Sequence, residues 1–206
     1  MDTRALVELG RSGLAALVLS GLVVAADVTA ATAGGWRLEE GVSVPSYAVA
    51  EPVASNLNID VVALVCEEAG SERGMQLQLY LSSPGPLIPA GASPQQLKEQ
   101  ARAEVVLDGQ VFPVDILFAD DRVVLADARR QQAPVLSDRF VDALQAARTM
   151  QLRFDLLRMH PGDAREFDGE ATIALGAGTG SQAVAAVRRC AEPSNRPMAS
   201  VAVPSQ

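Results

Sequence analysis

Hydrophobic and polar residues alternate with a period of two along much of this chain, which is the pattern of β-strands. The most apolar stretch after the N-terminal leader, residues 58–66, is hydrophobic on both faces and rich in β-branched side chains, as expected of a strand covered on both sides. Alternation elsewhere is clear enough to predict about seven strands. These are residues 58–66, 75–81, 103–107, 111–118, 122–127, 150–156 and 167–175.

The second of these strands shows the alternation best. The side chains predicted to face the core are Met75, Leu77, Leu79 and Leu81. The intervening glutamines and Tyr80 are predicted to face out. With the preceding strand it would form a hairpin whose longer, polar loop covers residues 67–74.

A second hairpin is predicted around Asp108-Gly109, a dipeptide that suits a tight turn with positive φ. One face of its second arm carries Phe112, Val114, Ile116 and Phe118. Pro113 and Asp115 fall on the other face, which is therefore expected at an edge or in water.

Two short helices complete the prediction. Ser137 is a suitable N-cap for a helix over residues 138–148, and a second helix is expected over residues 182–190. Residues 95–102 are assigned a helical turn, and residues 129–134 a polar connection. A proline-rich loop, residues 83–94, contains four prolines and two glycines, so it is expected to lack regular structure.

The first 33 residues have the features of an export signal. Arg4 and Arg11 precede an uncharged apolar run of 13 residues, and Ala31-Thr32-Ala33 offers the small residues that a signal peptidase requires. Such a run would rise about 20 Å as a helix, short of the roughly 30 Å hydrocarbon core. We therefore expect a cleaved signal and no stable membrane insertion of the mature chain, with Val24-Ala25-Ala26 as a second possible cleavage site.

The predicted organisation has four parts: a signal peptide (1–33), an irregular N-terminal segment (34–57), one β-rich domain (58–191) and a flexible tail (192–206). Within the irregular segment, Trp36 or Tyr47 is expected to pin the chain to the domain.

The two cysteines, Cys66 and Cys190, lie 124 positions apart. In the oxidising compartment that export implies, one structural disulfide is the simplest expectation, and a pair of buried thiols is the alternative. A metal site is not expected, because two cysteines and one histidine without close spacing do not match a zinc motif.

The net charge of the mature chain limits the classes of partner that we expect. The leader carries two of the 17 basic and three of the 25 acidic residues, which leaves 15 against 22 and a net charge of −7 in the mature chain. An acidic domain without a basic cluster is not expected to bind nucleic acid or anionic lipid.

Three sequence features invite a catalytic interpretation, and each has a simpler one. His160, the only histidine, precedes a proline in a polar turn. Asp120-Asp121 falls between two strands, where aspartate favours turns. The glycine-rich stretch 176–180 lacks the spacing of a phosphate-binding loop and is predicted to be a flexible entry to the last helix. No catalytic residue and no cofactor is therefore predicted.

The order of these elements resembles a known family. It comprises a signal peptide, Trp36 early in the mature chain, a strand ending in Cys66, the alternating Met75-Gln76-Leu77-Gln78-Leu79, the turn Leu107-Asp108-Gly109 and a helix closing on Cys190. This is similar to the invasion-associated locus B family of exported bacterial proteins over residues 36–190. The resemblance implies an immunoglobulin-like β-sandwich without a catalytic centre, in which Cys66 and Cys190 match the terminal cysteine pairing. The chain departs from the family in having its first cysteine thirty residues after Trp36.

The predicted fold is a mainly β, antiparallel, immunoglobulin-like sandwich with two short helices; the alternative is an α+β fold with helices on one antiparallel sheet. The leading functional hypothesis is a periplasmic or secreted, non-enzymatic protein that binds an unknown envelope or host protein. Its exposed sheet edges and proline-rich loop are the candidate surfaces. The alternatives are a small hydrolase using His160 with a nearby carboxylate, and a carrier of a small apolar ligand between the two layers.

Overall fold

The computed structural model of the chain describes residues 35–69, 72–119, 121–158, 166–176 and 178–192. The predicted signal peptide, His160 and residues 193–206 of the predicted tail lie outside these ranges.

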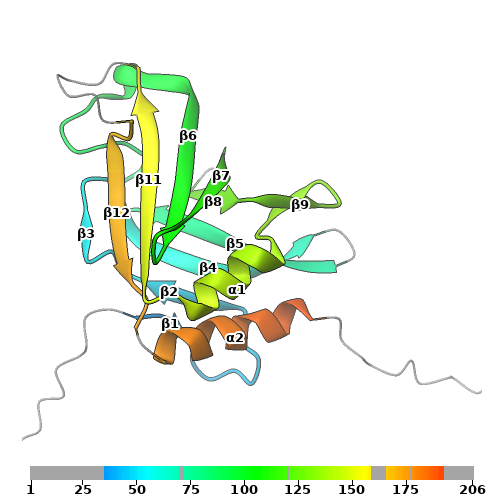
Figure 1. The fold of residues 1–206 in the computed structure, drawn as a ribbon. Helices are drawn as coiled ribbons and strands as arrows, with labels where there is room; N and C mark the ends of the chain where they lie inside the picture. Colours follow the sequence, from blue (N-terminus) through cyan, green and yellow to red (C-terminus); the bar gives the residue numbers. More distant parts are fainter. Residues whose placement is uncertain (1–34, 70–71, 120, 159–165, 177, 193–206) are drawn as a thin grey trace, which may run out of the picture. The chain divides into compact units, whose positions relative to one another are not determined.

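The described residues form a mainly β fold (Figure 1). Its strands are β1 (Arg37–Leu38), β2 (Tyr47–Ala50), β3 (Ala54–Ser55), β4 (Ile59–Ala69), β5 (Glu72–Leu81), β6 (Leu97–Leu107), β7 (Gln110–Phe118), β8 (Arg122–Ala126), β9 (Ala128–Arg130), β10 (Ala133–Val135), β11 (Thr149–Leu157) and β12 (Gly169–Ala174). A 3₁₀ turn (Pro94–Gln96) and the helices α1 (Asp138–Ala146) and α2 (Thr179–Ala191) complete the fold. The predicted mainly β fold with two short helices is confirmed.

Ten strands form one antiparallel sheet in the order β1-β2-β4-β5-β8-β7-β6-β11-β12-β3, and β9 pairs with β10 in a separate ribbon. Strand β7 joins two halves of the large sheet, because its first part pairs with β6 and its second part, from Asp115 onward, pairs with β8. A strand shared in this way makes a corner, and the strands of the two halves run in clearly different directions in Figure 1. The sheet thus curls around one core.

The core lies between the two halves and the helices. Phe140, Phe154 and Met150 are among its fully buried side chains, and Phe112 meets Phe140 edge to face at 5.0 Å.

All seven predicted strands are present, and β4 with β5 forms the expected hairpin. The predicted polar loop is wrong, since pairing continues through Glu67 opposite Gly74 to Ala69 opposite Glu72. Cross-strand pairing extends the ladder through a segment whose polar residues hide the alternation.

The segment over residues 34–57, predicted to be mostly irregular, contains three short strands, β1, β2 and β3. Strand β2 pairs along β4 from Tyr47 opposite Val65 to Ala50 opposite Val62. Of the two residues expected to pin this segment, Trp36 is buried in the core, whereas Tyr47 is exposed. These strands have two to four residues, too few for a periodic pattern to show.

Two other segments are more regular than predicted. Residues 129–134 contribute to the β9–β10 ribbon, whose turn residues Gln131 and Gln132 have φ of 47° and 72°. Glutamine is an unusual residue for such a turn, so the sequence does not mark it. The helical turn expected over residues 95–102 covers only Pro94–Gln96, and Leu97 already opens β6.

The tight turn at Asp108-Gly109 is confirmed, with φ of 46° and 92°. Asp108 has a further role, because its carboxylate accepts hydrogen bonds from the backbone N–H groups of Arg148 (3.0 Å) and Thr149 (2.9 Å). This aspartate therefore joins the hairpin to the start of β11.

Both predicted helices form. Ser137 caps α1 by accepting a hydrogen bond from the N–H of Phe140 at 3.1 Å, and α1 buries Phe140, Val141 and Leu144. Helix α2 packs against α1 and against β2, β4 and β5. At the start of α2 the backbone packs closely, because a Cβ at Gly180 would overlap the carbonyl oxygen of Leu175.

Two side chains depart from the predicted faces. Gln78 is 1% exposed although it was expected to face solvent. Its amide donates to Gln76 Oε1 (3.0 Å) and accepts from the Tyr80 hydroxyl (3.1 Å), so the side chain lies satisfied along the sheet. Phe118 is 60% exposed, because it ends β7 at the rim of the sheet.

Candidate functional site

A cleft of about 680 Å³ lies between the proline-rich loop and the edge of the sheet at β3 and β12. Residues 89–92 of the loop form one wall and residues 54–56 the other, while Leu157 and Phe167 contribute apolar surface. Polar groups come from Ser55, Gln96, Asp168, Glu170 and Thr172. The cleft combines apolar surface with a few polar groups, as small binding sites do.

Asn56 fixes the sheet wall of the cleft. Its side chain donates to the carbonyl of Asp168 (2.9 Å) and accepts from the N–H of Glu170 (2.6 Å). Its own backbone N–H donates to the carbonyl of Glu170 at 3.1 Å. One asparagine thus holds the end of β3 to the start of β12.

Asn58 fixes the loop wall. Its side chain accepts from the N–H of Ile88 (2.9 Å) and donates to the carbonyl of Pro86 (3.0 Å). The N–H of Ala90 donates to the carbonyl of Asn56 at 2.7 Å, and Leu87 is buried in the core. The middle of the proline-rich loop, residues 86–90, is therefore anchored.

Charged side chains hold Phe167 and Leu157 in position. The guanidinium of Arg153 lies over the Phe167 ring at 4.5 Å and bonds Glu104 at 2.5 Å. The carboxylate of Asp168 accepts from the backbone N–H groups of Leu156 (3.0 and 3.1 Å) and Leu157 (2.8 Å). By accepting these hydrogen bonds, Asp168 stabilises the backbone at the end of β11.

A buried ion pair locks β6 to β11 beside the cleft. The carboxylate of Asp155, with its side chain 3% exposed, binds the ammonium of Lys98 and both Nε (2.9 Å) and Nη2 (2.8 Å) of Arg102. Burial alone would raise the pKa of Asp155, but the hydrogen bonds and charges of Lys98 and Arg102 outweigh it and hold that pKa below its ordinary value.

Asp155→Asn should lower the free energy of unfolding by about 2 kcal/mol at pH 7, because it removes charge-assisted bonds while leaving both cations within reach of water. A carboxylate with a lowered folded pKa stabilises above its unfolded pKa of about 3.9 and loses that contribution as pH falls through the folded value. The difference between variant and wild type should therefore shrink below about pH 4.

Urea denaturation at a series of pH values measures this effect. Asp115→Asn, in an exposed pair with Arg129, is the matched control and should cost less than about 0.5 kcal/mol. An Asp155→Asn deficit that is equally large at pH 3 would contradict the assignment.

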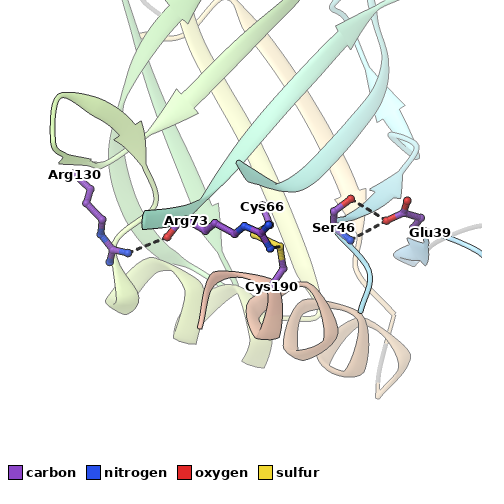
Figure 2. Close-up of a disulfide and its surroundings, with 6 residues drawn as sticks. All are labelled: Glu39, Ser46, Cys66, Arg73, Arg130 and Cys190. Carbon is purple, nitrogen blue, oxygen red and sulfur yellow. Dashed lines mark hydrogen bonds between the residues drawn. A yellow bond between two sulfur atoms is a disulfide. The ribbon is translucent and has the colours of Figure 1, made fainter. Parts of the chain in front are cut away.

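The two cysteines predicted to pair do so (Figure 2). The Cys66–Cys190 disulfide, with Cα atoms 6.2 Å apart, joins β4 to the last turn of α2. Arg73 Nη1 lies 3.5 Å from Cys190 Sγ, and Arg130 Nη1 donates to the carbonyl of Arg73 at 3.0 Å.

A second cleft, of about 860 Å³, lies near the disulfide and is lined by residues that include Arg73, Arg130 and Arg188. Two of its arginines are paired, Arg130 with Glu72 and Arg188 with Asp142.

The sheet edges predicted as binding surfaces are short. Strands β1 and β3 have two residues each, and Pro52 precedes β3. Such edges limit pairing with another chain to a few residues. Of the surfaces proposed from the sequence, both the proline-rich loop and the sheet edge at β3 line the cleft.

Of the other sequence candidates, those that the structure describes do not line this cleft. His160 and Asp120 lie outside the described residues, and Asp121 makes an exposed ion pair with Arg122 at 2.8 Å. Among the described residues, no group of three or more His, Cys, Asp and Glu side chains is placed to hold a metal ion. In the same part of the chain, no helix has the length and apolar character needed to cross a membrane.

A scan against protein-family models and searches of curated proteins and of solved structures find no match to this chain.

Sequence analysis missed Asn56, Asn58 and Asp168, which build the cleft. Asn56 bonds residues 112 and 114 positions away, a partnership that no local pattern reveals. The available signal was two asparagines spaced by two at a strand entry, where their side chains commonly bond the backbone.

Proposed function

We propose that the mature chain is an exported, non-enzymatic binding protein that holds an envelope or host protein in the cleft beside its proline-rich loop. The observation that carries this proposal is the anchoring of both cleft walls by Asn56 and Asn58. A site whose walls are already ordered loses less conformational entropy on binding than a mobile loop does.

The chemistry of the cleft supports binding. Its volume of about 680 Å³ suits a few side chains of a partner. Asp168 uses its oxygens to hold backbone N–H groups, so it acts as a structural group. The disulfide agrees with export, because such bonds persist in oxidising compartments.

Site-specific photo-cross-linking tests the proposal. The full chain is expressed in an exporting bacterial host with a photoreactive amino acid at Ala90, an exposed residue of the cleft wall, and intact mass reports whether residues 1–33 are removed. We expect a discrete protein adduct from Ala90 and none from Gln182, an exposed position on α2.

A further substitution, Asn58→Ala, tests the loop. It removes the side-chain hydrogen bonds that hold the loop and should reduce the yield of the Ala90 adduct severalfold. Equal adducts from Ala90 and Gln182, or none from Ala90, would refute the cleft as the binding site. Retention of an uncleaved chain in the cytoplasm would refute export.

A further inference from the structure

We infer that the cleft takes an extended polypeptide segment of its partner, one in which an apolar side chain neighbours a basic one. This inference rests on the proposed function, which requires only a protein partner at the cleft, and adds the conformation and chemistry of the bound segment.

The backbone of β3 offers hydrogen bonds to such a segment. Ser55 lies opposite Ala171, and the N–H of the next residue, Asn56, bonds the carbonyl of Glu170 at 3.1 Å. In an antiparallel ladder, hydrogen-bonded and non-hydrogen-bonded pairs alternate. The Ser55–Ala171 pair therefore corresponds to a non-hydrogen-bonded position, at which the N–H and carbonyl of Ser55 are directed away from β12, and Ser55 itself lines the cleft.

The two cleft walls separate at this point. The bond between Ala90 N–H and the carbonyl of Asn56 joins them, and the loop then turns back through a bond from Ala92 N–H to the carbonyl of Pro89 at 3.1 Å. An added strand needs a spacing of about 4.8 Å from its neighbour, so a strand beside Ser55 fits only where the walls have parted. The short length of β3 restricts this pairing to a few residues of the partner.

The side chains around Ser55 select the partner's chemistry. Phe167 and Leu157 give the cleft apolar surface, and Val53, 54% exposed, lies two residues before Ser55. These groups suit an apolar side chain on the bound segment, which projects to one side of a strand.

Charge at the cleft is negative. Glu170 is exposed there, and no described residue forms an ion pair with its carboxylate. The neighbouring cations are engaged, Arg153 with Glu104 and Arg102 with Asp155. Glu170 is thus placed to attract a lysine or arginine of the partner. A second copy of the mature chain, with a net charge of −7, is a poorer match.

Fluorescence anisotropy of the oxidised mature protein with labelled short peptides tests this inference. One set alternates apolar residues with lysine or arginine, and a matched set replaces the basic residues with aspartate or glutamate. We expect binding of the basic set, weakened about threefold to fivefold by Glu170→Gln. Glu40→Gln, the same charge change at an exposed position that does not line the cleft, should have no effect.

Backbone methylation of the bound peptide tests the strand geometry without altering the protein. An N-methyl group should abolish binding at alternate positions and be tolerated at the positions between them, because only every second N–H of an added strand faces Ser55. Uniform effects along the peptide would overturn the strand assignment.

Three other results also overturn the inference: equal binding of acidic and basic sets, an unchanged affinity for Glu170→Gln, or no peptide binding at all. Photo-cross-linking from Ala90 tests the proposed function separately. An adduct without peptide binding means that the cleft holds a folded surface, whereas loss of both removes the cleft as a site.

Discussion

Replacing both Cys66 and Cys190 by alanine is expected to lower the free energy of unfolding by about 3 to 5 kcal/mol. The bond closes a loop of 124 residues, for which the chain-entropy model gives about 5 kcal/mol as an upper figure. It also fixes the last turn of α2 to β4, where the helix covers the core. Guanidinium denaturation of wild type and the double variant at pH 7 measures the difference.

Two controls separate the covalent link from the loss of side-chain packing. Wild-type protein treated with a thiol reductant should reach the same stability as the double variant. Arg73→Gln removes the guanidinium beside Cys190 but keeps the bond, and should change stability by less than about 1 kcal/mol. A double variant as stable as wild type, or wild-type protein whose mass shows two free thiols, would contradict a structural disulfide.

Gly180→Ala is expected to destabilise the protein by about 3 kcal/mol. The added Cβ would overlap the carbonyl oxygen of Leu175 and lie 2.9 Å from its carbonyl carbon, both backbone atoms that cannot rotate away. It would also lie 3.6 Å from Cδ1 of Trp36, the only tryptophan of the chain. Denaturation followed by tryptophan fluorescence therefore reports stability and any shift of the buried Trp36.

Two nearby substitutions calibrate this result. Gly178→Ala meets no atom within 4 Å but places alanine at a φ of 83°, which costs about 1 kcal/mol. Gln182→Ala, on the exposed side of α2, should change stability by less than about 0.5 kcal/mol. If Gly180→Ala were no less stable than Gly178→Ala, the backbone at the start of α2 would be able to move away from the added Cβ, which would contradict the expected clash.

The sequence predicts the parts of the fold that follow a strong local pattern. Strand β5 is long enough for alternation to show, and β4 shows as a continuous apolar run. Local chemistry marks the β6–β7 turn at Asp108-Gly109 and the cap of α1 at Ser137. Strands β1 and β3 have two residues each, so partners far along the chain create them. The sharing of β7 between two halves of the sheet likewise depends on partner register, which alternation does not encode.

The candidate site was predictable only in part. Proline and glycine content marks the loop over residues 83–94, but the anchors Asn56 and Asn58 act on backbone groups about 30 to 110 residues away. Gln78 shows the same limit, because burial of a polar side chain depends on the three neighbouring side chains that satisfy its amide.

The packing of α2 against β2, β4 and β5 also bears on how the chain is made. The helix is among the last described elements to leave the ribosome, while the strands that it covers are among the first. The inner faces of those early strands, including Leu64 and Leu77, must therefore remain uncovered through most of synthesis. A nascent chain in this state exposes apolar surface for a long period, and holding chaperones recognise that kind of surface.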